Sequence, residues 1–392
     1  MAVSLKPVAE QVVVITGASS GIGLSAARLF CARGVRGLVL VARNAAALRQ
    51  VADGLRSQRT RVVTVPADTS RREDLERVAQ RAIETFGGFD TWVNDAAVAL
   101  YGNVERIPIE DQRRLFDVNY WGVVNGSLIA ARHLRRRGGA IINLGSVLSE
   151  RTMVLQTQYS ASKHAVKGFT DGLRMELERD AAPIAVTLIK PSSTDTPHTE
   201  HARTYLDEEP RLPPPTYDPN LVAQAIVFAA ENRRRELTIG FGGWMIGALG
   251  QIAPRITDRV MEAAGRRMQT VRRPERSPMR DNLYTARQDG DEYSSLPGKP
   301  RRTSVLLATQ MHPLAAAAIL AGLGAAITAL LLPRGLARQR RAAAPARPVR
   351  RDRPMTRRLG NGHDEPKFGP GHMGPGRMGR QAGPEKHPQA RH

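Results

Sequence analysis

Val12-Val13-Val14-Ile15-Thr16-Gly17-Ala18-Ser19-Ser20-Gly21-Ile22-Gly23 is the stretch that decides the fold of this chain. It opens with a β-branched run, which favours a strand, and the helical pattern of residues 24–33 follows it. The glycine-rich turn between them points backbone N–H groups and the positive helix end at an anion. Gly17 permits a tight turn, Gly21 lets a phosphate approach the backbone, and Gly23 lets the helix pack on the strand. This order of elements predicts a phosphate-binding site.

The same alternation of apolar runs and helical patterns continues to about residue 240. Further strands are predicted at 38–42, 62–65, 91–93, 140–144, 184–189 and 237–239, with helices at 72–86, 109–137, 159–179 and 221–230. This alternation predicts an α/β fold, a Rossmann-type doubly wound parallel sheet whose ligands lie beyond the carboxyl ends of the strands. Several loops are therefore expected to converge on one rim, and they carry Gly17, Arg43, Asp68, Asn94, Ser146 and Pro191.

Arg43 follows the second predicted strand, about twenty residues beyond the glycine-rich turn. An acidic residue at this place would bind the ribose hydroxyls of NAD, whereas an arginine suits the additional phosphate of NADP. The alternative is a solvated arginine before a helix-capping Asn44. Asp68, after the third strand, is expected either to bind the adenine amine or to cap the next helix. The predicted cofactor is therefore NADP(H), with NAD less favoured.

Tyr159 and Lys163 stand four residues apart at the start of a predicted helix, so they share one face. An adjacent ammonium favours the phenolate, so we expect a lowered tyrosine pKa and proton exchange near neutral pH. A solvated surface pair is the alternative, which the spacing alone does not exclude. Asn119 is a further candidate, because asparagine is a poor helix former and this one lies between Val118 and Tyr120, where a polar side chain needs a partner.

Together these residues resemble the short-chain dehydrogenase/reductase family over about residues 12–240. Asn119 lies 27 residues before Ser146, which lies 13 before Tyr159, and this spacing and the glycine motif carry the resemblance. The resemblance implies that Tyr159 is the general acid/base and that Lys163 lowers its pKa and holds the nicotinamide ribose. It also implies that Ser146 binds the substrate oxygen and that Asn119 supports a water-linked proton path through Lys163.

The cofactor set combines the loop residues above with positions that the resemblance implies. Its members are Thr16, Gly17, Ser19, Ser20, Gly21, Ile22, Gly23, Arg43, Asp68, Asn94, Ala96, Tyr159, Lys163, Pro191 and Thr196. Two departures from the family concern cofactor affinity. Asn94-Asp95-Ala96-Ala97 stands where the family commonly has Asn-Asn-Ala-Gly, and Pro191-Ser192 stands where it commonly has Pro-Gly.

The predicted function is hydride transfer between NADP(H) and a carbonyl or secondary alcohol. The alternative is an NADP-binding redox-sensing scaffold that tethers a partner or membrane through a basic tail, but a pure binder needs no acid/base pair. The resemblance implies a homodimer or homotetramer formed through the helices that carry Asn119 and Tyr159. His198 and His201 lack a third ligand and are expected at the surface, so no metal site is predicted.

The 392 residues are predicted to form one catalytic domain with appendages. The predicted boundaries are 1–253 for the NADP-binding catalytic domain, 254–312 for an amphipathic helix and linker, 313–333 for a membrane-associated or transmembrane helix, and 334–392 for a disordered basic tail. The tail carries 15 Lys and Arg against 4 Asp and Glu, about half of the net charge of +21. It contains no base-reading module, so nucleic acid is not an expected partner.

Residues 314–332 are uncharged, rich in Ala and Leu, and close to the length that spans a bilayer. A single span would place the basic tail outside, against the positive-inside tendency, so we expect an anchor in or on the membrane, with burial in a protein as the alternative. The start of the chain lacks the pattern of a signal peptide and the single cysteine excludes an intrachain disulfide, which predicts a cytoplasmic catalytic domain. The apolar stretch 241–252 is expected to pack on the core or at a subunit interface, with a lipophilic substrate entrance as the alternative.

Overall fold

The computed structural model describes residues 4–56, 60–271, 281–287 and 290–331. Contacts divide the chain into two units, Met1–Ile327 and Thr328–His392. The predicted basic tail lies outside the described residues. The fold and the site described below belong to the first unit.

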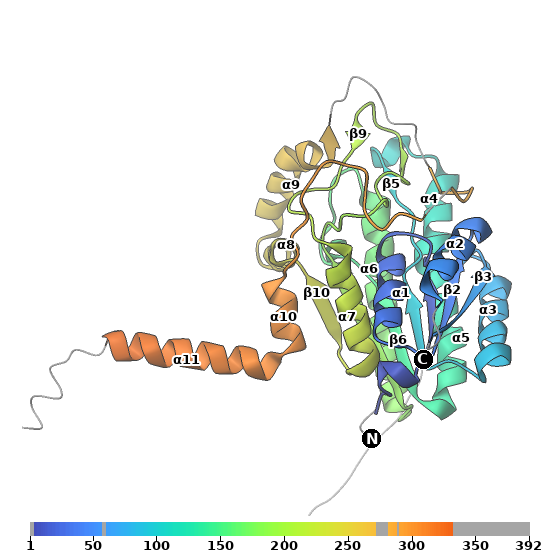
Figure 1. The fold of residues 1–392 in the computed structure, drawn as a ribbon. Coiled ribbons are helices and arrows are strands. Elements are labelled where there is room, and N and C mark those ends of the chain that lie inside the picture. The colour runs from blue at the N-terminus through green and yellow to red at the C-terminus, as the bar shows by residue number, and fades with distance from the viewer. Residues whose placement is uncertain (1–3, 57–59, 272–280, 288–289, 332–392) are drawn as a thin grey trace, which may run out of the picture. The chain divides into compact units, whose positions relative to one another are not determined.

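Within the described residues, a parallel sheet of seven strands confirms the predicted doubly wound fold (Figure 1). The strand order is β10-β7-β6-β4-β1-β2-β3. The order reverses between β1 and β4, which is where doubly wound sheets bind ligands. The bounds are β1 Val12–Thr16, β2 Gly37–Ala42, β3 Arg61–Pro66, β4 Thr91–Asn94, β6 Gly139–Leu144, β7 Ile184–Pro191 and β10 Glu236–Ile239.

Helices cover both faces of this sheet. One face packs against α1, α2 and α7, and the other packs against α3, α5 and α6. The bounds are α1 Gly21–Ala32, α2 Ala45–Leu55, α3 Arg72–Phe86, α4 Ile109–Phe116, α5 Gly122–Arg137, α6 Thr157–Arg179 and α7 Pro219–Glu231. The predicted helix 72–86 coincides with α3, and the other boundaries shift by a few residues.

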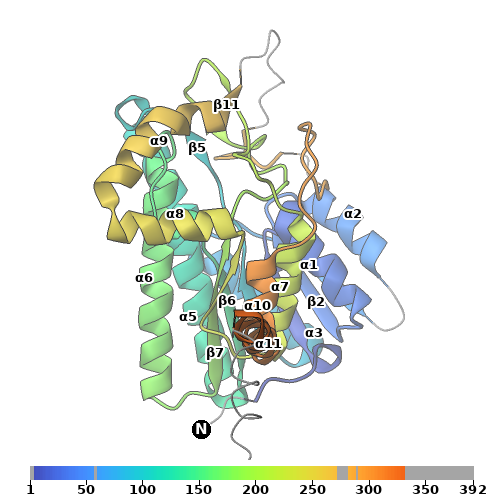
Figure 2. The same cartoon turned by 90° about the vertical axis from the view of Figure 1, so that its left-hand side faces the viewer.

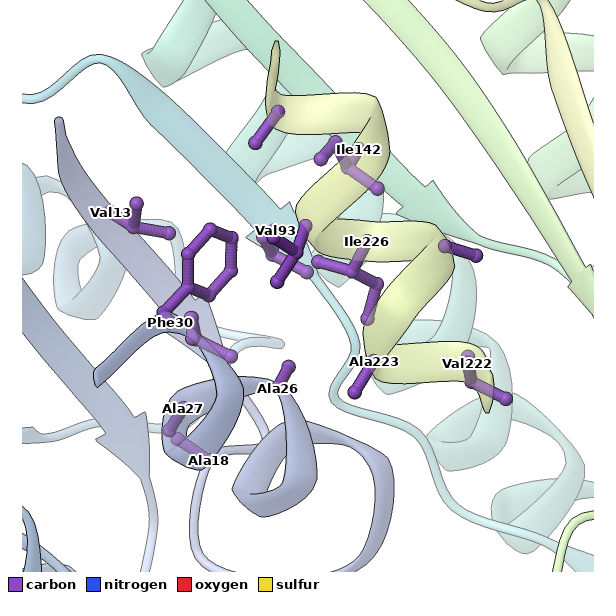
Figure 3. Close-up of a cluster of buried hydrophobic side chains, with 14 of the residues drawn as sticks. Val13, Ala18, Ala26, Ala27, Phe30, Val93, Ile142, Val222, Ala223 and Ile226 are labelled. Carbon is purple, nitrogen blue, oxygen red and sulfur yellow. The ribbon is translucent and has the colours of Figure 1, made fainter. Parts of the chain in front are cut away.

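The β-branched run at the start of the sheet is buried on both sides. Successive residues of a strand point to opposite faces. Val13 therefore lies with Phe30 of α1 and Ile226 of α7 in one core (Figure 3), and Val12 and Val14 lie in the other core. Burial on both faces explains why this strand is continuously apolar rather than alternating.

A π-helical turn, Asp117–Trp121, interrupts the predicted helix 109–137 between α4 and α5. Asn119 lies in this turn and is completely buried. Its Oδ1 accepts a hydrogen bond from the Val98 N–H at 2.8 Å, and its Nδ2 donates to the Val98 carbonyl at 3.0 Å. The backbone of Val98 is thus the partner that this buried asparagine needs, and such irregular turns are frequent at functional sites.

Further short strands and helices surround the seven-stranded sheet and its covering helices. They are β5 Leu100–Tyr101 paired with β8 Arg203–Thr204, β9 Glu209–Pro210 paired with β11 Thr270–Val271, and the helices α8 Phe241–Ile252, α9 Pro254–Gln269, α10 Val305–Met311 and α11 Pro313–Leu331. Gln310 of α10 donates to the Thr238 carbonyl at 3.1 Å and accepts from the Thr238 N–H at 2.9 Å. This side chain therefore satisfies part of the open edge at β10.

In the described part of the chain, no helix taken singly meets the length and hydropathy expected of a membrane span. Val305–Met311 and Pro313–Leu323 meet these criteria only as a pair, and they are bent by 113° at their junction.

Candidate active site

A cavity of about 340 Å³ lies at the carboxyl ends of the strands. It brings together residues that are far apart in the sequence. The sequence-predicted residues that line it are Gly17, Ser19, Ser20, Gly21, Ile22, Arg43, Asp68, Ala96, Ser146, Tyr159, Lys163, Pro191 and Thr196. Thr16, Gly23, Asn94 and Asn119 are not among its lining residues.

The glycine-rich turn has the backbone shape of an anion cradle. Gly17 and Gly21 have φ angles of +75° and +52°, which side chains other than glycine rarely adopt. A Cβ on Gly23 would lie 2.3 Å from the carbonyl oxygen of Gly17, so only glycine lets α1 start this close to the turn. The turn and the N-terminus of α1 therefore fit the pyrophosphate of a dinucleotide.

Thr16 and Asn94, which do not line the cavity, form hydrogen bonds that connect the strand ends next to it. The Thr16 hydroxyl donates to the Val93 carbonyl at 3.2 Å and accepts from the Asp95 N–H at 3.1 Å, which ties β1 to β4. Asn94 donates to Asn143 Oδ1 at 2.8 Å within a buried polar network. Direct contact of Thr16 or Asn94 with a cofactor stays a prediction.

Ser146, Tyr159 and Lys163 meet at the other end of the cavity. The Tyr159 side chain lies near that of Ser146, which acts to lower the pKa of Tyr159. Lys163 is 3% exposed, and its Nζ donates to the Leu144 carbonyl at 2.8 Å, at the end of β6. The same Nζ lies 5.7 Å from the centre of the Tyr159 ring. Asn119 does not line the cavity. Its Nδ2 donates to Ser162 Oγ of α6, the helix that carries Tyr159 and Lys163, at 3.3 Å.

Burial decides the protonation of this cluster. It raises the pKa of Tyr159 above its ordinary value, and the effect of Ser146 only partly offsets this. The predicted lowering of the Tyr159 pKa is therefore wrong for this structure, because burial of the phenol is the largest effect on it and the neighbouring Tyr101 and Asp95 also raise it. Burial also lowers the pKa of Lys163 to about 8. At neutral pH the cluster consists of a neutral phenol and a largely protonated amine.

Asp95 adds a carboxyl group to this cluster. Its carboxylate lies beside Gly23, where a Cβ would approach Asp95 Oδ2 to 2.9 Å, and close enough to Lys163 for a direct electrostatic attraction. Burial raises the pKa of Asp95 to about 7, against the opposing effect of Lys163. The departure from Asn-Asn-Ala-Gly thus places a titratable group between the glycine-rich turn and Lys163.

His198 is a pocket residue that the sequence did not identify. Both histidines were expected at the surface, but His201 is only 6% exposed and His198 lies against Tyr159, with 5.7 Å between the ring centres. Burial and the nearby Lys163 ammonium lower the pKa of His198 to about 4, so its imidazole is neutral at pH 7. The loop after β7 folds over the site, and this folding brings the histidines inward.

The end of the cavity near β2 and β3 carries Arg43 and Asp68. Arg43 Nη1 donates to the carbonyls of Leu283 and Tyr284, each at 3.3 Å. Asp68 forms an ion pair with Arg114 at 2.6 Å. Burial would raise the pKa of Asp68, but its hydrogen bonds from Arg114 and Ser70 prevail and lower it. Asp68 is therefore an ionised acceptor.

Beyond Tyr159 the cavity wall is largely apolar. It is formed by the loops after β6 and β7 together with α8 and α9, and includes Leu148, Met153, Leu212, Ile246, Met261 and Met268. Gly243 of α8 lies so close to Val147 that a Cβ would approach Val147 Cγ1 to 2.7 Å. The apolar stretch 241–252 therefore packs against the site and forms part of its wall.

This sheet, its glycine cradle and the Ser-Tyr-Lys cluster define a class of nicotinamide-dependent oxidoreductases. The family profile described as short chain dehydrogenase matches residues 11–207. The chain is 42% identical over 322 residues to the uncharacterized oxidoreductase YxnA of Bacillus subtilis (strain 168), covering 81% of this chain and 90% of that protein. The chain belongs to the short-chain dehydrogenase family.

More distant relatives cover only part of the chain. It is 38% identical over 195 residues to 11-beta-hydroxysteroid dehydrogenase A of Sesamum indicum, which is 49% of this chain and 55% of that protein. Two solved structures align with it at 25% identity. They are an alcohol dehydrogenase of Thermococcus sibiricus complexed with 5-hydroxy-NADP (TM-score 0.52, 59% of this chain and 96% of that one) and a 3-ketoacyl-(acyl-carrier-protein) reductase of Brucella melitensis complexed with NADH (TM-score 0.51, 58% and 96%).

Proposed function

We propose that this protein is an NADP(H)-dependent oxidoreductase that interconverts a carbonyl group and a secondary alcohol. The meeting of Ser146 and Tyr159 in one cavity, beside the anchored amine of Lys163, is the observation that carries the proposal. When bound, the nicotinamide cofactor supplies or accepts the hydride. The glycine cradle would hold its pyrophosphate, and Arg43 its 2′-phosphate.

The protein residues then handle the oxygen and its proton. Ser146 and Tyr159 present two hydroxyl groups at one place in the cavity, so both can donate to the same substrate oxygen. In the direction of reduction, Tyr159 gives its proton to the forming alkoxide as general acid. Protonated Lys163 then stabilises the phenolate from its position 5.7 Å from the ring centre.

We further propose that the substrate is a lipophilic ketone or aldehyde. The wall beyond Tyr159 supplies methionine, leucine and isoleucine side chains, and the histidine beside Tyr159 is neutral at pH 7. Such a wall favours an apolar group next to the carbonyl. The name of the sesame relative, which refers to a hydroxysteroid, agrees with this substrate class.

The test is a panel of ketones and aldehydes assayed with NADPH and with NADH, for the parent and for Tyr159→Phe. We expect activity with NADPH, and a loss of about 100-fold or more in kcat for the variant, because general acid catalysis is worth that much. Binding of NADPH, followed by its fluorescence, should stay within about twofold, since the ring remains in place. Tyr120→Phe, on the neighbouring π-helical turn, is the matched control. Turnover of Tyr159→Phe close to that of the parent contradicts the assignment.

We also propose that the chain associates with a membrane and that its catalytic domain is cytoplasmic. The support comes from α11, where large apolar side chains among the described ones are exposed. Leu314 is 87% exposed and Ile319 is 64% exposed. Such exposure is uncommon for a run of large apolar residues in a water-soluble helix.

A further inference from the structure

Residues 281–287, here called the strap, lie at the cofactor end of the cavity although they follow the family match by more than seventy residues. Asn282, Ala286 and Arg287 are part of the cavity lining. Figure 1 shows this short segment beside α4, above the end of the sheet. The extension that follows the family domain therefore reaches back to the dinucleotide site.

An apolar contact and an ion pair help to anchor the strap. Leu283 is 1% exposed and packs in a core cluster that contains Leu115 of α4. Asp281 is paired with Arg203 at 2.5 Å, and Arg203 is also paired with the buried Asp111 at 2.8 Å. The strap is thus attached both to α4 and to the loop that carries β8, which fixes its backbone over the site.

This backbone directs its carbonyl groups at two arginines. Arg43 donates to the carbonyls of Leu283 and Tyr284, each at 3.3 Å, and to that of Asn282. Arg114 Nε donates to the Leu283 carbonyl at 3.1 Å. Carbonyl acceptors orient a guanidinium, so these bonds hold Arg43 in position.

Arg287 is the arginine that the strap itself contributes to the cavity lining. Its carbonyl accepts a hydrogen bond from Asn44 Nδ2 at 2.7 Å, which joins the strap to the residue that follows Arg43. The Arg287 side chain is exposed, its Nε donates to the Asp281 carbonyl at 2.9 Å, and the residue lines the cavity. Two arginines, one from the family domain and one from the strap, therefore border the cofactor end of the cavity.

We propose that the strap completes the binding site for the 2′-phosphate of NADP(H), by positioning Arg43 and by supplying Arg287 as a second ligand. The proposal rests on the proposed NADP(H) function and extends it. A phosphate monoester offers several charged acceptor oxygens, which two guanidinium groups can share. The extension would then set cofactor preference, a property that the family domain would otherwise determine alone.

The experiment titrates the full chain with adenosine 2′,5′-bisphosphate and with 5′-AMP, by calorimetry. For Arg287→Gln we expect about tenfold weaker binding of the bisphosphate, as for the loss of one charge-assisted contact. Binding of 5′-AMP should change by less than about twofold, because AMP lacks the 2′-phosphate. Arg302→Gln is the control, since its parent side chain is 88% exposed and carries the same charge.

Two further variants distinguish a failure of the strap proposal from a failure of the proposed NADP(H) function. Leu283→Ala removes the buried apolar contact of the strap without changing its charge. It should weaken binding of the bisphosphate more than binding of AMP, with folding checked by circular dichroism. Arg43→Gln should also abolish the preference for the bisphosphate, and an unchanged preference would contradict the NADP(H) assignment itself. If only Arg43→Gln has an effect, the strap proposal fails and the NADP(H) assignment stands. Tighter bisphosphate binding by Leu283→Ala would also overturn it, because the strap would then compete with the phosphate for Arg43.

Discussion

Asp95 is the residue whose position changes the chemistry of the site most. A neutral side chain is common at this place in the family, whereas the carboxylate of Asp95 lies near Lys163 and beside Gly23. Its negative charge raises the pKa of Lys163 and also that of Tyr159. Both effects keep the two groups protonated to higher pH, so Asp95 extends the range in which Tyr159 can donate a proton.

Replacing Asp95 by Asn should therefore move the alkaline limb of the kcat/KM profile for reduction to lower pH. Without the carboxylate, the pKa of Lys163 should fall below its present value of about 8. The pKa of Tyr159 should fall as well, because Asp95 raises it in the parent. A shift of about one pH unit is typical for the loss of a neighbouring charge. The measurement is a pH–rate profile at limiting substrate, with Asp117→Asn, an exposed position on the π-helical turn, as control. A limb that stays in place or moves to higher pH contradicts this role.

The helix α11 agrees in extent with the apolar segment predicted at 314–332. Ile319 and Leu323 are 64% and 55% exposed, so their side chains are not used by the fold of the chain. A helix of this kind stabilises a membrane-bound state by transferring its apolar surface into the lipid.

We expect the double variant Ile319→Asp with Leu323→Asp, made in the full chain, to bind vesicles much more weakly. Each aspartate opposes insertion of a helix centre by about 2.5–3.5 kcal/mol, and about 1.4 kcal/mol is a factor of ten, so a loss of about 100-fold or more is expected for the pair. Co-sedimentation with vesicles that contain anionic phospholipid measures the bound fraction. Ile109→Asp, at a 52% exposed position at the start of α4, is the matched control. Equal binding of parent and double variant, or no binding of the parent, excludes the anchor.

At the level of the whole molecule, α5, α6 and the π-helical turn before α5 expose three large apolar side chains. Trp121, Leu128 and Met175 are 50%, 41% and 59% exposed, on the helices that carry or follow Asn119 and Tyr159. Large apolar side chains gathered on neighbouring helices mark association surfaces. We propose that a homodimer or homotetramer forms there.

The combined substitution Trp121→Arg and Met175→Arg should convert this oligomer into a smaller species, since it would bury unpaired charges. Light scattering coupled to gel filtration gives the mass of parent and variant. Val305→Arg, at a 79% exposed position on α10, should leave the mass unchanged. A monomeric parent, or a variant of parental mass, would show that this surface does not mediate assembly.

Much of the architecture follows from local patterns. The β-branched run at β1 predicts a buried strand, and helix 72–86 is found at its predicted bounds. Local patterns did not predict the π-helical turn at Asn119, because the partner of that side chain is the backbone of Val98, 21 residues earlier. Helical periodicity records which face is apolar, and it does not record a hydrogen bond to a distant loop.

The amino-acid order was sufficient for the doubly wound sheet and the glycine cradle, because burial periodicity and positive φ angles are properties of short segments. It also indicated the Ser-Tyr-Lys cluster through spacing. Only the tertiary structure decided that His198 faces Tyr159, that Asp95 faces Lys163, and that the strap reaches Arg43. Those contacts join segments up to 241 residues apart, and their formation depends on how whole elements pack rather than on the conformational preferences of any one of them.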